Sequence, residues 1–292
     1  MKDTFKSYHP IINFIYFIAV IGISMFVMHP VFLLISFVGS LSYAIYLGGV
    51  KVIYTQLLYS LPLCIIIGLI NPLFNHEGIT ILMYLGENPL TLESIYYGCA
   101  MAVLFINVML WFYVYQYVMT SDKLIYLMGR KLPNLSLIFS MTLRFVPLFQ
   151  RQFKKVMSAQ EGIGNSSNQK SIFEKIRWGS KVLSIMITWI LETAIDTADS
   201  MKSRGYGLKG RTSFSNYTFK GRDIRLLIIL ILLLVCLGVG LRYGVAYVRY
   251  FPSMKFEGIS LKSGIVYLIY GALCMLPVSL HLVEDMKWRY LR

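Results

Sequence analysis

Charge is scarce in this sequence. Only 14% of its 292 residues are charged, whereas 57% are hydrophobic and the mean hydropathy is +0.62. A soluble globular protein has about one quarter charged residues, so the composition excludes an ordinary soluble domain and predicts an integral membrane protein. Acidic residues are the scarcer kind, because 14 Asp and Glu stand against 28 Lys and Arg, which gives a net charge of +14. In a membrane protein such an excess marks cytosolic loops and lipid headgroups rather than nucleic acid.

Clusters of the residues that build common metal, redox or nucleotide sites are also missing. The four cysteines lie inside apolar runs without metal-type spacing, which predicts small core residues, and the four histidines are far apart. Neither set predicts a metal site, a cofactor or redox chemistry. No glycine-rich loop followed by Lys-Ser/Thr occurs, so the chain is not an ATPase of that type. The first apolar run lacks a small-residue cleavage site, which predicts a retained helix rather than a signal peptide.

Long apolar runs, in contrast, are abundant. A helix that crosses a bilayer needs about 20 mostly apolar residues. Runs of this kind occur at 11–28, 31–50, 52–70, 95–119, 226–241 (or as far as 250) and 264–283. The sequence therefore predicts an all-α polytopic membrane protein with about six transmembrane helices. We expect three regions: an N-terminal bundle of about four spans (1–120), a cytosolic region (121–225), and C-terminal transmembrane helices with a short cytosolic tail (226–292).

The charges of the loops predict an orientation. Residues 71–94 hold three glutamates and no Lys or Arg, so the positive-inside rule places this loop outside the cell. Counting crossings from there places both termini in the cytosol. Residues 242–262 run against the rule, because the same count places them outside although they hold four Lys or Arg and one Glu.

The region 121–225 is unusually basic, with 18 Lys or Arg and 7 Asp or Glu. It is too long for a simple loop and too apolar for a soluble domain. Residues 143–164 predict an amphipathic helix, with Pro147 near its start or at a kink. Its apolar face is formed by Phe145, Phe149, Phe153 and Val156.

A polar linker at 164–171 precedes a second predicted amphipathic helix at 181–205. Its apolar stripe is formed by Leu183, Ile187, Ile190, Ala194, Ala198 and Met201. A second, acidic-to-polar stripe is formed by Glu192, Asp196, Asp199 and Ser203. We expect Trp189 and the apolar start in or near the membrane, and the charged end in water.

Each amphipathic helix is expected to end at a glycine. Gly162 or Gly164 suits the end of the first helix and Gly205 the end of the second, because glycine tolerates the left-handed conformation that terminates many helices. Lys202 and Arg204 complement the negative end of the helix dipole. Taken alone, these features describe a well-capped helix with a basic last turn.

The motif "LRFVP…AQ", a linker, and the helix end "ADSMKSRGYG" together resemble the T component of energy-coupling factor (ECF) transporters, the EcfT/CbiQ family. The resemblance runs through nearly the whole chain and is most specific at 143–164 and 194–212. It implies a non-catalytic scaffold in a prokaryotic plasma membrane. Such a scaffold couples two cytosolic ABC-type ATPases to a small substrate-binding membrane protein, the S component, for vitamin or metal-ion uptake.

The resemblance also assigns docking residues. In this family, two coupling helices each end in an Ala-Arg-Gly or Ala-Arg-Ser type tripeptide, whose arginine docks into a groove of an ATPase. The second tripeptide corresponds to Ser203, Arg204 and Gly205, which keep the central arginine. The first corresponds to Gly162, Ile163 and Gly164. The isoleucine in place of arginine implies either a weak apolar contact or an ATPase partner with a changed groove.

Two other functions are compatible with the composition. An integral membrane enzyme acting on lipid would need clustered His or Asp motifs at the end of a span. The acidic stripe of the second amphipathic helix is the nearest feature, and it also suits a solvated or partner-facing surface. A secondary transporter predicts charged residues within spans and inverted repeats, whereas these apolar runs are almost free of charge.

Overall fold

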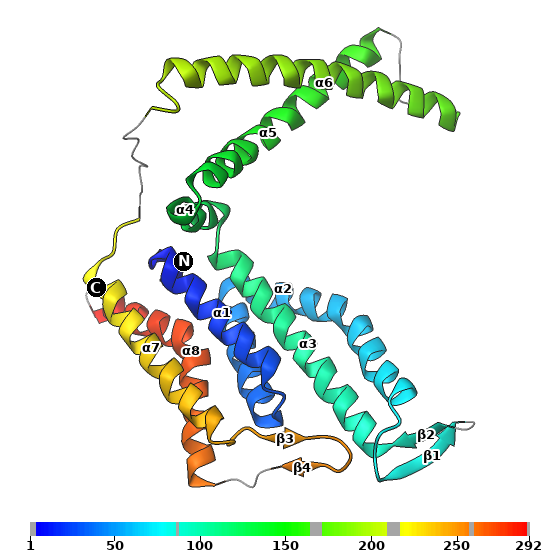
Figure 1. The fold of residues 1–292 in the computed structure, drawn as a ribbon, viewed down its shortest axis with the longest axis vertical. Coiled ribbons are helices and arrows are strands. Elements are labelled where there is room, and N and C mark those ends of the chain that lie inside the picture. Colours follow the sequence, from blue (N-terminus) through cyan, green and yellow to red (C-terminus); the bar gives the residue numbers. More distant parts are fainter. Residues whose placement is uncertain (1–3, 86–87, 164–170, 209–216, 257–259, 291–292) are drawn as a thin grey trace. The chain divides into compact units, whose positions relative to one another are not determined.

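The structure is a computed structural model that describes residues 4–85, 88–163, 171–208, 217–256 and 260–290. Its elements in chain order are η1 (Phe5–Ser7), α1 (Pro10–Phe26), α2 (Pro30–Phe74), β1 (Ile81–Leu85), β2 (Asn88–Thr91), α3 (Leu92–Val118), α4 (Ser121–Lys131), α5 (Pro133–Gly162), α6 (Ile172–Ser203), α7 (Gly221–Arg242), β3 (Val248–Arg249), β4 (Lys255–Phe256) and α8 (Leu261–Tyr290) (Figure 1). Two compact units result. Residues 1–124 and 217–292 form the membrane unit, and residues 125–216 form the arm unit.

The membrane unit confirms the expected all-α polytopic class. Within the described ranges, five helical segments are long and apolar enough to cross a bilayer, and α1 is a shorter apolar helix. The five are Pro30–Lys51, Ile53–Phe74, Leu92–Val118, Gly221–Arg242 and Leu261–Trp288. Two of these belong to α2, and within the first of them the helix is kinked at Gly49, where a backbone φ of +72° favours glycine.

Proline starts the first two helices. Pro10 and Pro30 occupy the first turns of α1 and α2, where their missing N–H groups would have no helical partner. The preceding residues, His9 and His29, are the N-caps, and each accepts a hydrogen bond on Nδ1 from a backbone N–H two residues later, at 3.3 and 3.2 Å. The "MHP" sequence therefore forms a short link between α1 and α2, as its proline predicts.

The core of the membrane unit is an aromatic cluster that joins η1, α1 and α3. Phe5, Tyr16, Phe17 and Trp111 are at most 1% exposed. The Phe5 and Tyr16 rings lie 5.1 Å apart, and the Tyr16 and Trp111 rings 6.2 Å apart, both edge to face. Such pairs add about 0.5–1.5 kcal/mol each to the burial of their surface. The indole Nε1 of Trp111 donates to Ser36 Oγ at 2.9 Å, so this polar atom is satisfied inside the bundle.

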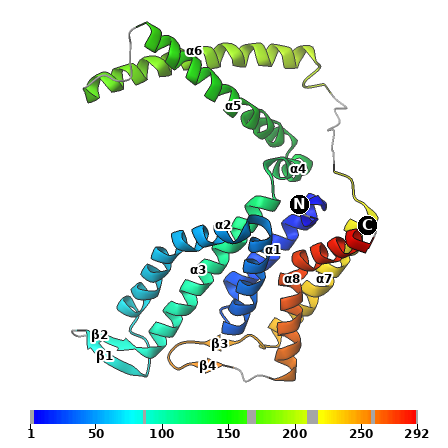
Figure 2. The same cartoon turned by 180° about the vertical axis from the view of Figure 1, so that it is seen from behind.

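The first and last described residues of the chain lie at one end of the membrane unit, together with the two segments that connect it to the arm unit. Thr4 donates to Glu284 near the end of α8 at 2.6 Å, and Lys123 in α4 donates to the carbonyl of Lys6 at 2.7 Å. The two hairpins, β1–β2 and β3–β4, lie at the opposite end (Figure 1, Figure 2). The termini and the connections therefore share one side of a membrane that this unit spans. Which side that is remains a prediction from loop charge.

One of the acidic residues in the loop at 71–94 is buried and hydrogen-bonded within the loop. Glu93, at the start of α3, is 4% exposed and accepts hydrogen bonds from the hydroxyl of Thr80 and from its N–H at 3.3 Å. Glu77 is exposed. One of the three glutamates counted for the orientation is thus an internal hydrogen-bond acceptor rather than a free surface charge.

Cysteine labelling tests the predicted sides of the membrane. In a background without native cysteines, Glu77→Cys should react with a membrane-impermeant maleimide on intact cells. Ser200→Cys, on exposed α6, should react only after permeabilisation. The opposite pattern would reverse the orientation, and labelling of both positions on intact cells would contradict the separation of the hairpin from the connections.

Candidate functional site

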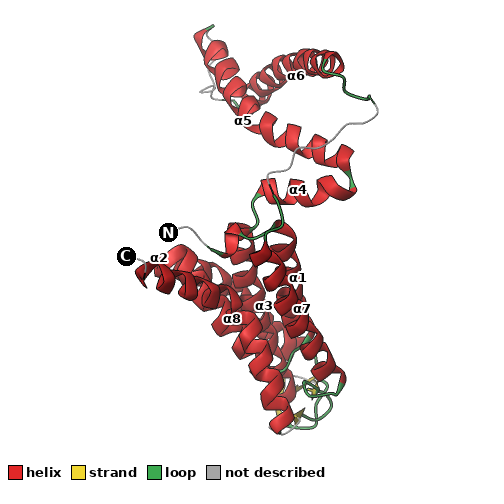
Figure 3. Cartoon of the chain, turned by 90° about the vertical axis from the view of Figure 1, so that its left-hand side faces the viewer, coloured by secondary structure: helices red, strands yellow, loops and turns green. Residues whose placement is uncertain are grey.

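The arm unit is built on the crossing of two long helices, α5 and α6 (Figure 3). At the crossing, Val156 of α5 packs against Val182 and Met186 of α6, with exposures of 8%, 1% and 8%. Phe149 meets Trp189 edge to face, with ring centroids 5.7 Å apart. The buried apolar surface is small, so the two helices are held together mainly at this one place.

The predicted apolar face of α5 is largely confirmed. Phe145 and Phe149 are partly buried and Val156 is buried, whereas Phe153, on the same side of the helix, is 44% exposed. Of these side chains, Val156 and Phe149 contact α6. Pro147 lies inside α5 rather than at its start.

The apolar stripe predicted for α6 is not the side of the helix that meets α5. Leu183 and Ile187 are 61% and 48% exposed, and the contact is made instead by Val182, Met186 and Trp189. One residue along a helix is a rotation of about 100°. Both stripes are apolar in this half of α6, so periodicity alone did not distinguish them. Only the contact with Val156 of α5 shows which of the two stripes is buried.

The apolar side of α6 that does not meet α5 is exposed. We call it the α6 apolar stripe; it comprises Leu183, Ile187, Leu191 and Ile195, which are 48–63% exposed. A spacing of four residues places all of them along one side of the helix. A contiguous apolar surface of this kind marks contact with lipid or with another protein.

The end of α6 is closed by a two-bond C-terminal motif. The N–H of Gly205 donates to the carbonyl of Lys202 at 3.0 Å, and that of Tyr206 donates to the carbonyl of Met201 at 3.0 Å. Gly205 has a φ of +81°, so the predicted left-handed termination is confirmed. The Schellman geometry satisfies carbonyls that the helix end would otherwise leave unpaired.

This termination presents Arg204 at the tip of α6. Arg204 is the C-cap, with φ −85° and ψ 8°, and its side chain is exposed. No ion pair joins it to another residue in the ranges that the structure describes. Ser203 is the last helical residue, and its hydroxyl donates to the carbonyl of Ser200 at 2.9 Å. Ser203, Arg204 and Gly205 thus form a rigid corner with one outward cation.

The neighbouring charges of α6 lie on an exposed face. Lys202 is 4.0 Å from Asp199, and their side chains are 78% and 70% exposed. Glu192 and Asp196 are also exposed. A surface pair of this kind contributes about 0–1 kcal/mol to stability, so Lys202 is a useful comparison for Arg204: similar in charge and position, but already paired.

The end of α5 differs from that of α6. Gly162 is its last helical residue, and it is absent from the described residues with positive φ, which are Gly49, Gly205, Gly207 and Gly244. Gly162 therefore does not provide the left-handed termination that was one of two options. The other option, Gly164, lies outside the described residues. Ile163 is the C-cap, and its side chain is 74% exposed.

Titratable side chains do not converge elsewhere into a metal-type cluster. Among the described residues, no group of three or more His, Cys, Asp or Glu is placed to hold a metal ion. Cys64 and Cys274 are buried as predicted, but Cys99 and Cys236 are exposed on α3 and α7 and were wrongly assigned to the core. Helices in lipid expose apolar side chains on their outer faces, which explains why apolar runs did not predict burial.

Comparison with known proteins places this fold in a family. The family model described as "CbiQ: Cobalt transport protein" matches residues 6–214, which is most of the chain and includes both arm helices. The chain belongs to the CbiQ family. It is therefore a membrane protein of a transporter family, as the resemblance implied.

Curated relatives of this CbiQ protein are bacterial proteins named "Energy-coupling factor transporter transmembrane protein EcfT". The protein from Lactobacillus helveticus is 34% identical over 101 residues, covering 34% of this chain and 36% of the relative. Those from Exiguobacterium sibiricum and Bacillus subtilis are 34% and 30% identical and are covered to 41% and 40% of their length. The chain thus aligns with about two fifths of the length of these relatives.

A substitution at Gly205 tests whether this glycine sets the tip of the CbiQ protein. In Gly205→Ala, a Cβ would lie 3.1 Å from Leu208 Cδ1 at a φ of +81°. The left-handed conformation costs about 1–2 kcal/mol without glycine, so local opening of the last turn should rise about 5–30-fold. Limited trypsin digestion of the purified chain, followed at Lys202 and Arg204, measures this opening.

Gly162→Ala is the matched control. An added Cβ there meets nothing within 4 Å, and the backbone is helical. Cleavage at the α6 tip should be unchanged. If trypsin cleaved Gly205→Ala at Lys202 and Arg204 no faster than the parent chain, the left-handed glycine would not stabilise this helix end.

Proposed function

We propose that this chain is the T component of an ECF-type importer, a non-catalytic scaffold that joins two ABC-type ATPases to a substrate-binding S component. In this role the two transmembrane regions expected from the sequence, residues 1–120 and 226–292, hold the complex in the plasma membrane of a prokaryote. The arm region (121–225) meets the ATPases in the cytosol, where both termini also lie. ATP hydrolysis belongs to the partner subunits. Membership of the CbiQ family and the EcfT relatives support this assignment.

The observation that carries the proposal is the closed tip of α6. A helix that ends at Gly205 presents Arg204 at a fixed place instead of extending past it. A guanidinium is permanently charged and planar, and it can bind a carboxylate through two parallel hydrogen bonds. Arg204 at this tip is therefore suited to an acidic groove on an ATPase. Ser203 and Gly205 shape the corner that presents it.

The tip of α5 supports an unequal second contact. Ile163 is exposed and apolar, so it can contribute burial but not a charge-assisted hydrogen bond. Full burial of its side chain would contribute about 1.5–3 kcal/mol. We infer that Gly162, Ile163 and Gly164 form the weaker of two docking sites, in an ATPase groove that is apolar at this position.

The α6 apolar stripe supports contact with a membrane partner. Its four exposed side chains lie before the acidic and basic end of the helix, so one helix carries an apolar surface and a charged tip. A rigid helix with both features could transmit motion from an ATPase at the tip to a protein at the stripe. The S component is the partner that this arrangement fits.

The substrate would be chosen by the S component. The family description names cobalt and the names of the EcfT relatives state no cargo. In the described residues the spans of this chain contain few charges, which fits a scaffold better than a carrier. A vitamin or a metal ion remains the expected class of cargo.

Charge replacement at the α6 tip tests the docking role. Arg204→Ala should weaken recruitment of the ATPases, because truncation of one side of a buried charge pair costs about 2–5 kcal/mol. Arg204→Glu should abolish recruitment through like-charge repulsion. The measurement is pull-down of the ATPases from membranes that contain equal amounts of each variant, together with substrate uptake.

Two variants serve as controls. Lys202→Ala removes the same charge two residues earlier and should leave recruitment nearly unchanged. Ile163→Ala should leave an assembled, partly active complex. Normal recruitment by Arg204→Glu, combined with loss in Ile163→Ala, would show that the principal docking tip is on α5.

A second pair of variants separates the packing of α6 from its partner surface. Met186→Ala removes a buried side chain at the crossing and should destabilise it by about 2 kcal/mol or more. Leu183→Ser changes an exposed position and should leave the crossing intact but reduce recovery of the S component. Hydrogen exchange of α5 and α6 in the isolated chain and co-purification from membranes provide the two measurements. Unchanged recovery of the S component in Leu183→Ser would remove the stripe from the interface.

A further inference from the structure

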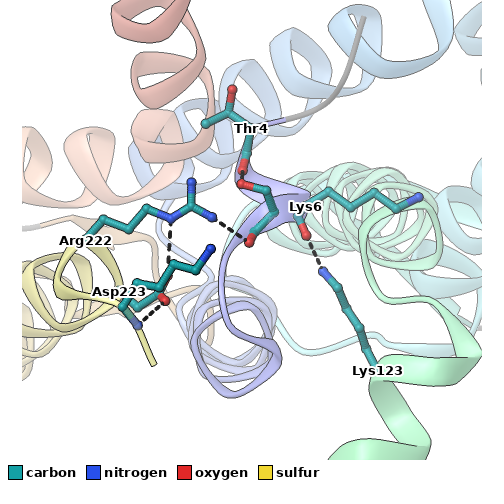
Figure 4. Close-up of polar contacts among 7 residues, drawn as sticks. Thr4, Lys6, Lys123, Arg222 and Asp223 are labelled. Atoms are coloured by element: carbon teal, nitrogen blue, oxygen red, sulfur yellow. Dashed lines mark hydrogen bonds and ion pairs between the residues drawn. The ribbon is translucent and has the colours of Figure 1, made fainter. Parts of the chain in front are cut away.

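The short helix η1 lies beside the two chain segments that connect the membrane unit to the arm unit. The chain leaves the membrane unit after Leu124 and re-enters it at Tyr217. We call residues 119–124 the outgoing connection and residues 217–223 the return connection. Figure 4 shows polar side chains from both connections directed at the backbone of η1.

The outgoing connection is held by a buried lysine. Lys123 is 4% exposed, and its Nζ donates to the carbonyl of Lys6 at 2.7 Å. With the amide of Asn13 oriented so that its nitrogen donates to the carbonyl of Phe5 at 3.2 Å, the Asn13 oxygen accepts from Lys123 Nζ at 2.8 Å. A buried ammonium is costly without such partners. Lys123 therefore fixes the first turn of α4 against η1.

The return connection is held by an arginine. Arg222 donates from Nη2 to the carbonyl of Ser7 at 2.9 Å, and its guanidinium lies 5.0 Å from the centre of the Tyr8 ring. Burial raises the pKa of Tyr8 above its ordinary value. Asp223 is 2% exposed and accepts from the N–H of Lys220 at 2.9 Å, which caps α7.

A stacked pair adds a second contact to the return connection. The ring of Phe219 lies 3.8 Å from that of His9, with the planes 22° apart. His9 is also the N-cap of α1. The return connection thus meets η1 through Arg222 and the start of α1 through Phe219.

The helix η1 is itself anchored to the rest of the membrane unit. Thr4 donates to Glu284 of α8 at 2.6 Å, and its hydroxyl lies 2.8 Å from His281 Nδ1. Ser7 donates from Oγ to the carbonyl of Thr4 at 2.7 Å. Phe5 is 1% exposed within the aromatic cluster. Successive carbonyls of an anchored turn, those of Lys6 and Ser7, therefore hold the two connections.

We propose that η1 is a clamp that fixes both connections to the membrane unit, with Lys123 and Arg222 as its positioning residues. A force on the arm unit is then transmitted to the transmembrane helices, because the two connecting segments are anchored and cannot move independently of the membrane unit. This coupling role rests on the proposed function, whereas the clamp itself does not.

The clamp is tested first in the purified chain, without partners. Hydrogen exchange should become at least fivefold faster across 119–124 in Lys123→Met, which keeps most of the apolar stem of the side chain and removes its donors. It should become at least fivefold faster across 217–223 in Arg222→Gln. Lys123→Arg, which keeps charge and donors, should restore at least part of the protection.

Each variant has a matched control. Lys6→Met makes the same change in the partner residue but keeps the backbone carbonyl that accepts from Lys123. Arg225→Gln makes the same change as Arg222→Gln at an exposed position one turn further along α7. Both controls should exchange like the parent chain. Unchanged exchange in both Lys123→Met and Arg222→Gln would overturn the clamp.

The coupling role is tested in the complex reconstituted in liposomes, as substrate imported per ATP hydrolysed. Lys123→Met and Arg222→Gln should lower this ratio at least threefold while the ATPases remain bound. A faster exchange with an unchanged ratio would overturn the coupling role and leave η1 as a structural anchor. If the parent chain recruits no ATPases, the proposed function fails, and the exchange results still decide whether the clamp exists.

Discussion

A hydrocarbon bilayer offers no hydrogen-bond partner to the backbone, and the membrane unit is organised by this constraint. Its spans are helices that satisfy their own N–H and C=O groups. Some polar side chains inside the bundle pair with one another, as in Ser40 donating to Asn107 at 3.2 Å and Trp111 donating to Ser36. Helix starts are capped locally, by His9, His29 and Thr91. The non-helical backbone of this unit is then gathered at its two ends, in the hairpins and in η1.

The helices of the arm unit carry both charged and apolar faces. The main difference between α5 and α6 lies in how each helix ends. At α6 the stop is built from Gly205 and two backbone hydrogen bonds, and at α5 the helix continues through Gly162 to the C-cap Ile163. The two ends therefore differ in chemistry and in backbone geometry. This difference is the basis for expecting two unequal docking sites.

The sequence predicted most of the fold because its signals are strong and local. Long apolar runs fix the spans, and Gly205 after a basic turn fixes the end of α6. The contact stripe of α6 could not be predicted in the same way, since Val182 and Leu183 are equally apolar and only the partner helix selects between them. Neither could the burial of Lys123, because its acceptor is a carbonyl more than a hundred residues earlier in the chain. Contacts of this kind depend on tertiary structure and leave no periodic pattern.

The small contact between α5 and α6 has a mechanical consequence. Two stiff helices that touch near one point can rotate about that point, and the distance from the point to a helix tip sets how far the tip moves. From Met186 to Arg204 the helix rises about 27 Å at about 1.5 Å per residue. A rotation of roughly 10° about the crossing would therefore carry the tip through about 5 Å, about one turn of a helix. Val156, Val182 and Met186 would be the pivot of such a rotation, and their packing would determine how much of a force at the tip becomes rotation of α6 rather than bending.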